Sequence, residues 1–315
     1  MIFCRPKISA KLLSNSRKTS HTVAISPKID IYDLHHIHFH LYYSNRRYAK
    51  ERNMPTTYGH KIGLDTKLNE VLRWCVDLGI REVTMFMFSK ANFKRSPEEV
   101  AYLFQIFSDK LQRFLDASDT INDGLRFQIL GVWPLIPPNL QHLIANAVIK
   151  TKDNSKITFN IGFAHSARHL IHDGVKRVAE GLHRKEIKQS DVDEYLVENA
   201  MQLYPHHNVD VLVRTSETRL SDFVLWECNE GQLCFNETLW PQYSYWNLLE
   251  AVMLYQKRDF SSSWQVCQNA MIEEKRKRQN VNTSKQEEKR KEKFLQGLRK
   301  QVWDVLYKAE QIPVQ

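Results

Sequence analysis

Short apolar segments of β type alternate along this chain with longer segments that have helical spacing. The β-type segments occupy residues 83–88, 125–130, 157–163, 209–213 and 233–235. Segments with apolar residues three and four positions apart occupy residues 64–78, 97–115, 138–149, 167–181 and 246–260. Strands separated by helices favour parallel pairing, because each crossover is long enough to hold a helix that covers the sheet. The alternation therefore predicts an α/β fold with a mainly parallel central sheet covered on both faces.

The chain divides by composition into three parts. Residues 1–29 carry six Lys or Arg and no acidic residue, so this basic segment is expected to be disordered. A mitochondrial leader is the alternative for it, although no amphipathic pattern supports one. Residues 30–260 contain the strand signals and should form one domain with a full core. Residues 261–315 are charge-dense and predict a basic helical tail with an apolar stripe near its end.

The charge distribution bears on the class of partner. The formal net charge is +9 at pH 7, but the excess of Lys and Arg lies in the two terminal parts rather than in the central domain. This distribution does not predict a nucleic-acid platform, whereas basic ends suit peripheral contact with an anionic membrane surface. No apolar run reaches 18 residues, so the sequence predicts no membrane-spanning helix.

The cysteines do not have the spacing of a metal site, whereas the spacing of the N-terminal histidines leaves a metal site open as an alternative. The five cysteines form no CxxC pair and are interpreted as reduced thiols of a cytosolic protein. His36, His38 and His40 would share one face of a strand, where partly buried imidazoles are the favoured interpretation over metal ligands. The sequence therefore predicts no protein-held metal ion.

Phosphate-binding residue types follow the β-type segment 209–213. Arg214, Arg219 and Ser221 lie between that segment and a second apolar run, 223–226. Guanidinium groups bind phosphate oxygens through two parallel hydrogen bonds, and a hydroxyl group completes such a site. On spacing alone, the alternative is a surface turn with two solvated arginines.

Similar residues recur after other apolar segments. They are Ser44, Asn45, Arg46, Arg47 and His60 near the N-terminus, Ser89, Asn92 and Arg95 after residues 83–88, and Arg168 after residues 157–163. Ligands of open α/β sheets collect outside the carboxyl ends of the strands, so these side chains are expected to converge at one crevice. The shared pattern predicts a site that holds diphosphates.

Several motifs, taken in order, resemble those of the cis-prenyltransferase family. They extend over residues 36–256 and include SNRRYAK, GHKIG, LRWCVDLGIREVTMFMFSKANFKRS, FNIGFAHSARH, RTSETRLSDFVLW and LWPQYSYWNLLEA. The resemblance is greatest to the animal-type dehydrodolichyl diphosphate synthases. It implies synthesis of polyprenyl diphosphates by addition of isopentenyl diphosphate to an allylic, farnesyl-type diphosphate. It also implies helices that enclose an apolar tunnel, and a homodimer or a heterodimer with a related subunit at the cytosolic face of the endoplasmic reticulum membrane.

The resemblance assigns a role to most of the candidate residues. Matches to the loop that holds the allylic diphosphate are Ser44, Asn45, Arg46 and Arg47, with His60 beside it. Ser89 and Asn92 match residues near the reacting centre, and Arg95 matches an arginine that follows them in the family. Arg214, Arg219 and Ser221 match the cage for isopentenyl diphosphate. Asn45 and Asn92 are expected to act in catalysis, and all of these residues, together with Arg168, in substrate binding.

The chain departs from the family pattern at several positions of the same crevice. Tyr43 replaces the aspartate that holds Mg²⁺ against the leaving diphosphate, and a phenol is a poor magnesium ligand. Thr56 replaces an arginine, Ala91 replaces a glutamate, and the 214–219 loop lacks a glycine. The resemblance implies Mg²⁺ as a cofactor, but these residues put its binding here in doubt.

Two functional hypotheses follow from these observations. In the first, the chain is a cis-prenyltransferase of polyprenyl or dolichol diphosphate synthesis. In the second, it is a catalytically degenerate paralogue that binds a prenyl diphosphate or acts as a partner subunit, because Tyr43 replaces the metal-binding aspartate. If the chain does elongate prenyl substrates, Met87 should narrow the tunnel, since the family has alanine at this position.

Overall fold

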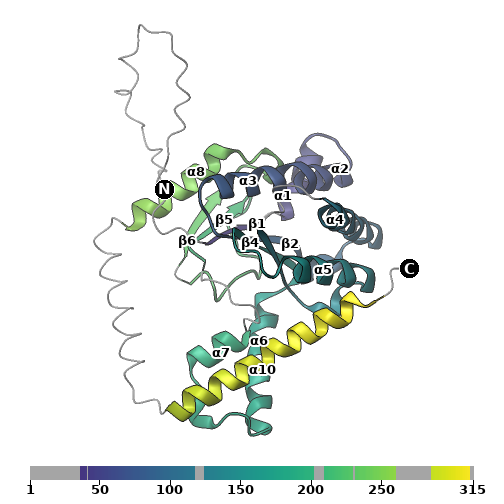
Figure 1. The fold of residues 1–315 in the computed structure, drawn as a ribbon. Helices are drawn as coiled ribbons and strands as arrows, with labels where there is room; N and C mark the ends of the chain where they lie inside the picture. The colour runs from purple at the N-terminus through teal and green to yellow at the C-terminus, as the bar shows by residue number, and fades with distance from the viewer. Residues whose placement is uncertain are drawn as a thin grey trace. The chain divides into compact units, whose positions relative to one another are not determined.

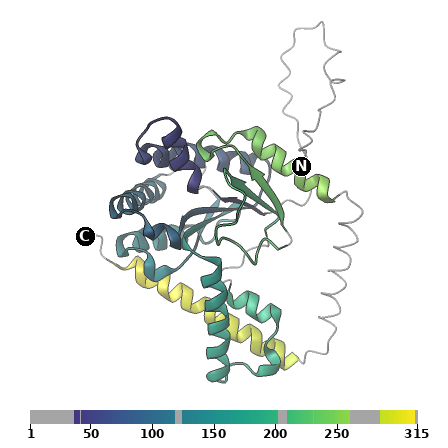
Figure 2. The same cartoon turned by 180° about the vertical axis from the view of Figure 1, so that it is seen from behind.

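Six parallel strands form one sheet in the computed structural model, in the order β3-β4-β2-β1-β5-β6 (Figures 1 and 2). The strands are β1 (His36–His40), β2 (Glu82–Ser89), β3 (Leu125–Leu130), β4 (Ile157–His165), β5 (Val211–Thr215) and β6 (Gln232–Asn236). This sheet and the helices between its strands confirm the predicted α/β class.

The described part of the chain comprises residues 36–40, 42–117, 124–201, 209–229, 231–259 and 285–312. All of these residues belong to one compact unit. The predicted disordered segment 1–29 lies outside the described residues, and so do positions 261–284 and 313–315 of the predicted tail.

Strands β2 to β6 lie close to the predicted β-type segments, with one shift that affects the candidate site. Strand β1 lies outside those segments, at the histidines that were expected to share one face of a strand. Strand β5 starts two residues later than predicted and ends at Thr215, so Arg214 belongs to the strand rather than to the loop after it. The apolar run 223–226 forms turns instead of a strand. Within it, Val224 has a φ of 45°, which is incompatible with extended backbone.

Helices connect the strands and cover the sheet. They are α1 (Tyr42–Glu51), α2 (Thr56–Lys61), α3 (Leu68–Asp77), α4 (Pro97–Asp116), α5 (Pro138–Thr151), α6 (Ala167–His183), α7 (Glu194–Met201), α8 (Tyr245–Asp259) and α10 (Lys285–Glu310). A π-helical turn, η2 (Ile62–Lys67), joins α2 to α3. Helix α4 begins as predicted, because the Ser96 side chain accepts a hydrogen bond from the Glu99 amide and Pro97 takes the first helical position.

Apolar side chains cover both faces of the sheet. Every residue of β2 is buried, as expected for a central strand between two layers. On one face, α3, α4 and α5 pack against the strands, and the ring of Phe163 stacks against Phe88 and Phe107 with centroids 5.2 and 4.9 Å apart. On the other face, Phe86 stacks against Phe223 of the loop after β5 at a centroid distance of 4.1 Å. This contact anchors the loop that carries Arg219 and Ser221.

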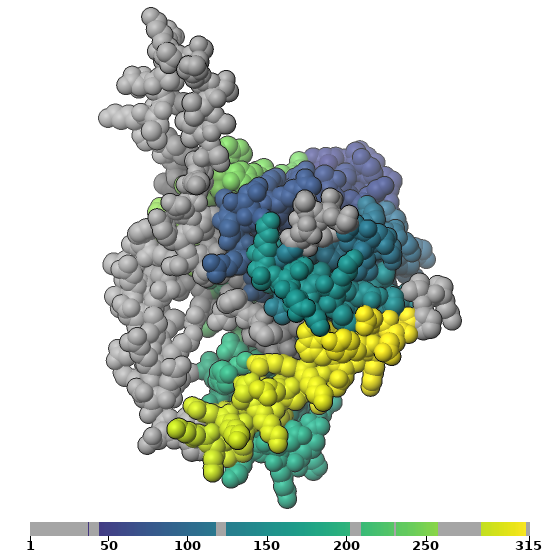
Figure 3. Space-filling view, viewed as in Figure 1, coloured from purple at the N-terminus to yellow at the C-terminus, as the bar shows by residue number. Residues whose placement is uncertain are grey.

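Helix α10 packs against α5 and α7 (Figure 3). Its Phe294, Leu295 and Leu298 form an apolar cluster with residues of α6 and α7. A Cβ atom at Gly181 of α6 would lie only 2.5 Å from Phe294 Cε2, so glycine permits this close approach. The Arg290 guanidinium adds two hydrogen bonds to the buried Asp191 carboxylate, at 2.9 and 2.7 Å.

Two separate cavities lie between α4 and the sheet, the first against η2 and the second against α3. The first, nearer the carboxyl ends of the strands, has a volume of about 20 Å³ and is lined by Met87, Asn45 and His60, among others. The second has a volume of about 70 Å³ and is lined mostly by apolar residues, which include Leu111 and Phe127. The continuous tunnel implied by the resemblance therefore stays a prediction. No helix in the described part of the chain combines the length and hydropathy needed to cross a bilayer.

Candidate functional site

The first and last predicted clusters meet at the carboxyl ends of β1 and β5, which are neighbours in the sheet. Helix α1 follows β1 and places the buried Ser44 hydroxyl 2.8 Å from Thr215 Oγ1 and 3.0 Å from Ser216 Oγ. Arg47 Nη1 donates to the Ser216 carbonyl oxygen at 2.7 Å. Residues about 170 positions apart in the sequence are thus hydrogen-bonded, which is the convergence expected of parallel strand ends.

Glu217 lies at the centre of the cluster formed by the loop after β5. Arg214 Nη2 donates to Glu217 Oε2 at 2.5 Å, and Arg219 Nε donates to the same oxygen at 2.8 Å. Arg47 Nη2 lies 3.7 Å from Glu217 Oε1, and Ser221 Oγ accepts from Arg214 at 3.4 Å. Burial of the carboxyl opposes ionisation, but hydrogen bonds and charge from Arg219 and Arg214 outweigh it and lower the pKa of Glu217. The cluster is therefore an array of cations around one ionised carboxylate.

The backbone of this loop adopts conformations that usually need glycine. Ser216, Ser221 and Asp222 have φ values of 64°, 52° and 61°. Left-handed conformations of this kind are unfavourable for residues with a Cβ atom, although short polar side chains tolerate them better than most. The sequence lacks the family's glycine here, and the loop achieves its turn with strained serine and aspartate residues instead.

A second cationic cluster surrounds Glu99 at the start of α4. Glu99 Oε1 accepts from Arg95 Nη1 at 2.5 Å, and lies 3.3 Å from His60 Nε2 and 3.6 Å from Arg46 Nε. The hydrogen bond with His60 and the charges of the two arginines lower the pKa of Glu99 to about 2. Burial lowers the pKa of His60 below its ordinary value, although Glu99 opposes the shift. The structure thus brings His60, Arg46 and Arg95 together as predicted.

The two asparagines with predicted catalytic roles differ in their surroundings. Asn92 Oδ1 accepts from the Ser89 amide at 2.6 Å and from the Ser89 hydroxyl at 2.8 Å, which caps the turn after β2. Asn45 is 5% exposed, and its Oδ1 atom has no hydrogen-bond partner. A Cβ atom at Gly63 would lie 2.4 Å from that oxygen, so glycine leaves room for the Asn45 side chain. An unpartnered buried oxygen is costly, which marks Asn45 as a residue suited to accept a hydrogen bond from a ligand.

Arg168 lies at the start of α6 and is the most exposed of the candidate arginines, with 80% of its side chain accessible. Its Nε atom lies 3.2 Å from Asp222 Oδ1, and its amide donates to the same oxygen at 3.1 Å. Ser166 Oγ donates to the other Asp222 oxygen at 2.6 Å. Since Asp222 follows Ser221, Arg168 is joined to the rim of the loop after β5.

Glu99, Glu217 and Asp222 were not predicted as site residues. Their only sequence signal is local: Glu99 is four residues after Arg95, and Glu217 is three residues after Arg214. Spacings of three and four residues are common for ion pairs, and so they do not single out a functional carboxylate.

The donor set in these clusters does not fit a protein-held magnesium ion. Magnesium needs hard oxygen ligands, usually one or two carboxylates together with phosphates and waters. Glu99, Glu217 and Asp222 already accept hydrogen bonds from arginine, histidine or serine side chains. The position of the family's aspartate is taken by Tyr43, whose phenol supplies no carboxylate.

Comparisons with known sequences are consistent with this arrangement. A family model described as putative undecaprenyl diphosphate synthase matches residues 44–262. The chain is 40% identical over 241 residues to the dehydrodolichyl diphosphate synthase complex subunit DHDDS of Homo sapiens, which covers 75% of this chain and 71% of that protein. It is 36% identical over 217 residues to the tritrans,polycis-undecaprenyl-diphosphate synthase (geranylgeranyl-diphosphate specific) of Methanocaldococcus jannaschii, with 68% and 77% covered.

Solved structures show the same fold. Lavandulyl diphosphate synthase from Lavandula x intermedia, crystallised with dimethylallyl diphosphate, matches with a TM-score of 0.65 and 25% identity, over 70% of this chain and 94% of that chain. A probable undecaprenyl diphosphate synthase from Campylobacter jejuni matches with a TM-score of 0.58 and 20% identity, over 71% and 95% of the two chains.

Proposed function

This chain belongs to the cis-prenyltransferase family, and on that basis we propose that it condenses isopentenyl diphosphate with an allylic, farnesyl-type diphosphate. The observation that supports this best is the pair of cationic clusters beyond the carboxyl ends of β2 and β5, each of which takes one arginine from α1. Arg46 Nε lies 3.6 Å from Glu99 Oε1, and Arg47 Nη2 lies 3.7 Å from Glu217 Oε1. Each cluster matches one diphosphate in charge and donor geometry, because guanidinium groups bind phosphate oxygens in a bidentate manner.

In the proposed complexes, each diphosphate replaces a glutamate as the acceptor of a cluster. The allylic diphosphate takes donors from the Glu99 cluster, and isopentenyl diphosphate takes donors from Arg214, Arg219 and Ser221. Negative charge that develops on the departing diphosphate is stabilised by Arg46 and Arg47, which already face these clusters. The unpartnered Asn45 Oδ1 accepts a hydrogen bond from a group that enters with the substrates.

The proposal includes a cellular setting. We place the protein at the cytosolic face of the endoplasmic reticulum membrane, in polyprenyl or dolichol diphosphate synthesis. It acts there as a homodimer or beside a related cis-prenyltransferase-like subunit. The support is the human relative, which by its name is a subunit of a complex. Coexpression with such a subunit, followed by size-exclusion chromatography, tests this part of the proposal.

A second function is favoured by one specific observation. Members of this family generally depend on Mg²⁺, whereas the clusters described here do not fit that ion and Tyr43 supplies no carboxylate. The alternative is a non-catalytic paralogue that binds a prenyl diphosphate or supports a catalytic partner subunit. Both functions use the same arginines to bind a diphosphate. The two functions differ in whether the protein itself converts its substrates to products.

One experiment separates the two functions. Purified full-length protein is incubated with farnesyl diphosphate and radiolabelled isopentenyl diphosphate, alone and with a partner subunit, with and without Mg²⁺. Labelled polyprenyl products from the protein alone support condensation. Binding of farnesyl diphosphate without any product, together with stimulation of the partner, supports the subunit role. Failure to bind either diphosphate contradicts both.

A further inference from the structure

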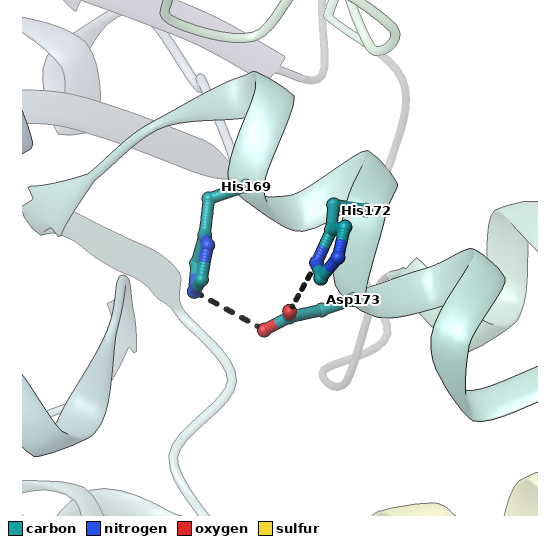
Figure 4. A group of neighbouring side chains, drawn as sticks. All are labelled: His169, His172 and Asp173. Carbon is teal, nitrogen blue, oxygen red and sulfur yellow. Dashed lines mark hydrogen bonds and ion pairs between the residues drawn. The ribbon is translucent and has the colours of Figure 1, made fainter. Parts of the chain in front are cut away.

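Three potential metal ligands gather on one side of helix α6, in the first turns that follow Arg168. They are His169, His172 and Asp173, and their ligand atoms all lie within 4.8 Å of one another (Figure 4). Residues three and four positions apart share one side of a helix, so the α6 backbone itself brings these side chains together. Their side chains are 28%, 70% and 32% exposed, which leaves them accessible to a cation from solvent.

The separations between these atoms match those of ligands around a small cation. His169 Nε2 lies 3.3 Å from Asp173 Oδ2, and His172 Nδ1 lies 3.1 Å from Asp173 Oδ1. Two ligands bound tetrahedrally at about 2.0–2.2 Å are separated by about 3.3–3.5 Å. Small rotations of the three side chains therefore suffice to bring one nitrogen of each ring and one carboxylate oxygen onto a shared ion.

The chemistry of the ligands selects the class of cation. Two imidazoles and one carboxylate suit Zn²⁺ and related transition metals, whereas Mg²⁺ prefers a shell made of oxygen atoms. Arg177 lies one turn further along α6 and interacts electrostatically with Asp173. The positive charge of Arg177 weakens the attraction of the Asp173 carboxylate for a cation. The Arg177 guanidinium also donates to the Ala200 carbonyl oxygen at 2.8 Å, and this contact holds it to α7.

The cluster borders a large cavity. His169 and Asp173 line a space of about 420 Å³ whose walls also include Leu130 at the end of β3 and Leu298 and Val302 of α10. A cation held by three protein ligands keeps at least one coordination position for water or another small ligand. We propose that His169, His172 and Asp173 form a three-ligand site for a zinc-class divalent cation at the rim of this cavity.

Titration with the metal alone tests the proposal. Full-length protein is stripped with a chelator and titrated with Zn²⁺ by calorimetry, in phosphate-free buffer with excess Mg²⁺. Co²⁺ replaces Zn²⁺ in a parallel optical titration. We expect saturable Zn²⁺ binding that Mg²⁺ does not displace, and a Co²⁺ spectrum without sulfur-to-metal charge transfer. His169→Ala and Asp173→Asn should each raise the dissociation constant at least about tenfold.

His183→Ala is the matched control, because His183 lies at the end of the same helix and outside the cluster. Its dissociation constant for Zn²⁺ should equal that of the unmodified protein. The altered side chains are at least partly exposed, so far-ultraviolet circular dichroism should show unchanged helix content in every variant. Zn²⁺ binding that persists unchanged in both His169→Ala and Asp173→Asn would assign the ion to other side chains and overturn the proposal. A sulfur charge-transfer band would do the same.

Discussion

At the scale of single residues, two glutamates balance the positive charge of the candidate site. Glu99 is a common partner of His60 and Arg95, and Glu217 is a common partner of Arg214 and Arg219. A buried guanidinium without a counter-charge is strongly destabilising, and Arg214 is only 1% exposed. The glutamates supply that counter-charge, so a diphosphate has to compete with a carboxylate in each cluster. The expected selectivity is for ligands that carry more than one negative charge.

The Glu99 cluster predicts loss of stability on acidification. The pKa of His60 is lowered from 6.5, so the unfolded chain takes up a proton that the folded protein resists, and stability falls as the pH drops below about 6.5. The pKa of Glu99 is lowered from 4.5 to about 2. The contribution of Glu99 to the free energy of unfolding is therefore complete above about pH 4.5 and is lost as the pH falls from 4.5 to about 2. Melting temperatures from about pH 7 to pH 3 should decline in two steps. In Glu99→Gln the lower step should shrink, and in the exposed neighbour variant Glu98→Gln it should remain.

Arg219 and Arg214 should respond differently to truncation. The Arg219 side chain is 62% exposed, so Arg219→Ala should weaken diphosphate binding by about 1.5–3 kcal/mol with little change in the free energy of unfolding. Arg214→Ala should weaken binding as well, and it should also destabilise the fold because it removes a buried partner of Glu217. Calorimetric titration and urea unfolding measure the two effects. Arg184→Ala, at the exposed C-terminal end of α6, is the control and should change neither diphosphate binding nor the free energy of unfolding. An unaltered dissociation constant in Arg219→Ala would instead support the interpretation of this loop as a surface turn with solvated arginines.

Position 43 should control the dependence of ligand binding on magnesium. Because Tyr43 offers no carboxylate, the unmodified protein should bind a prenyl diphosphate almost equally with and without Mg²⁺, and Tyr43→Asp should introduce a strong dependence. Adding Ser44→Gly restores the family pair but removes the hydroxyl that contacts Thr215 and Ser216. The double variant should therefore be less stable than Tyr43→Asp by about 1–3 kcal/mol. Strong magnesium coupling in the unmodified protein, seen by calorimetry, would refute this account.

At the scale of elements, the hydrophobic pattern located strands β2 to β6 but not the histidine-rich β1, and tertiary contacts decided where the strands end. The VTMFMF run became β2 because a continuous apolar strand is buried on both faces. The run 223–226 was equally apolar, but Phe223 is buried by stacking on Phe86 from a loop. A run of apolar residues indicates that these residues are buried, but it does not determine whether their backbone forms a strand or a turn. The hydrophobic pattern also missed the position of Arg214 inside β5. A charged residue ends an apolar run in the sequence, whereas in the structure the counter-ion Glu217 allows Arg214 to be buried within the strand.

Helix α10 gives an element-scale prediction. Phe294 is 4% exposed and packs against Gly181, whereas Val305 on the same helix is 42% exposed. Phe294→Ala should lower the free energy of unfolding by about 3–5 kcal/mol, because it opens a cavity between α10 and α6. Val305→Ala should change it by less than about 1 kcal/mol. Urea unfolding followed by tryptophan fluorescence measures both, and equal stability in the two variants would show that α10 is not held by this contact.

At the scale of the whole molecule, the parallel sheet explains how the site assembles. Residues 44–47, 89–95, 168 and 214–221 are scattered over most of the domain, yet each group lies at or just after the carboxyl end of a parallel strand, on one edge of the sheet. Strand alternation with helices was sufficient to predict that convergence. It was not sufficient to predict the contacts of Ser44 with Thr215 and Ser216, because a hydrophobic pattern does not specify how α1 is oriented relative to β5. For a site of this kind, the sequence predicts which residues take part and at which edge of the sheet they lie. The hydrogen bonds between these residues can be identified only from the structure.

The same geometry places Met87 where it can limit the length of a product. Successive strand residues alternate between faces, and Met87 lies on the face where it lines the small cavity beside Asn45 and His60. Its side chain is 7% exposed. Leu103, which lines this cavity, and Phe107, which lines the second cavity together with Leu111, are one helical turn apart on α4. Because the core is packed tightly, Met87→Ala should open a path between the two cavities and allow longer product chains.

In the Tyr43→Asp background, chromatography should show shorter products when Met87 is retained than when Met87→Ala is added, since a methionine side chain is flexible but still fills space. Leu254→Ala, at an exposed position of α8, is the control and should leave product length unchanged. Dolichol-length products with Met87 in place would refute the steric argument.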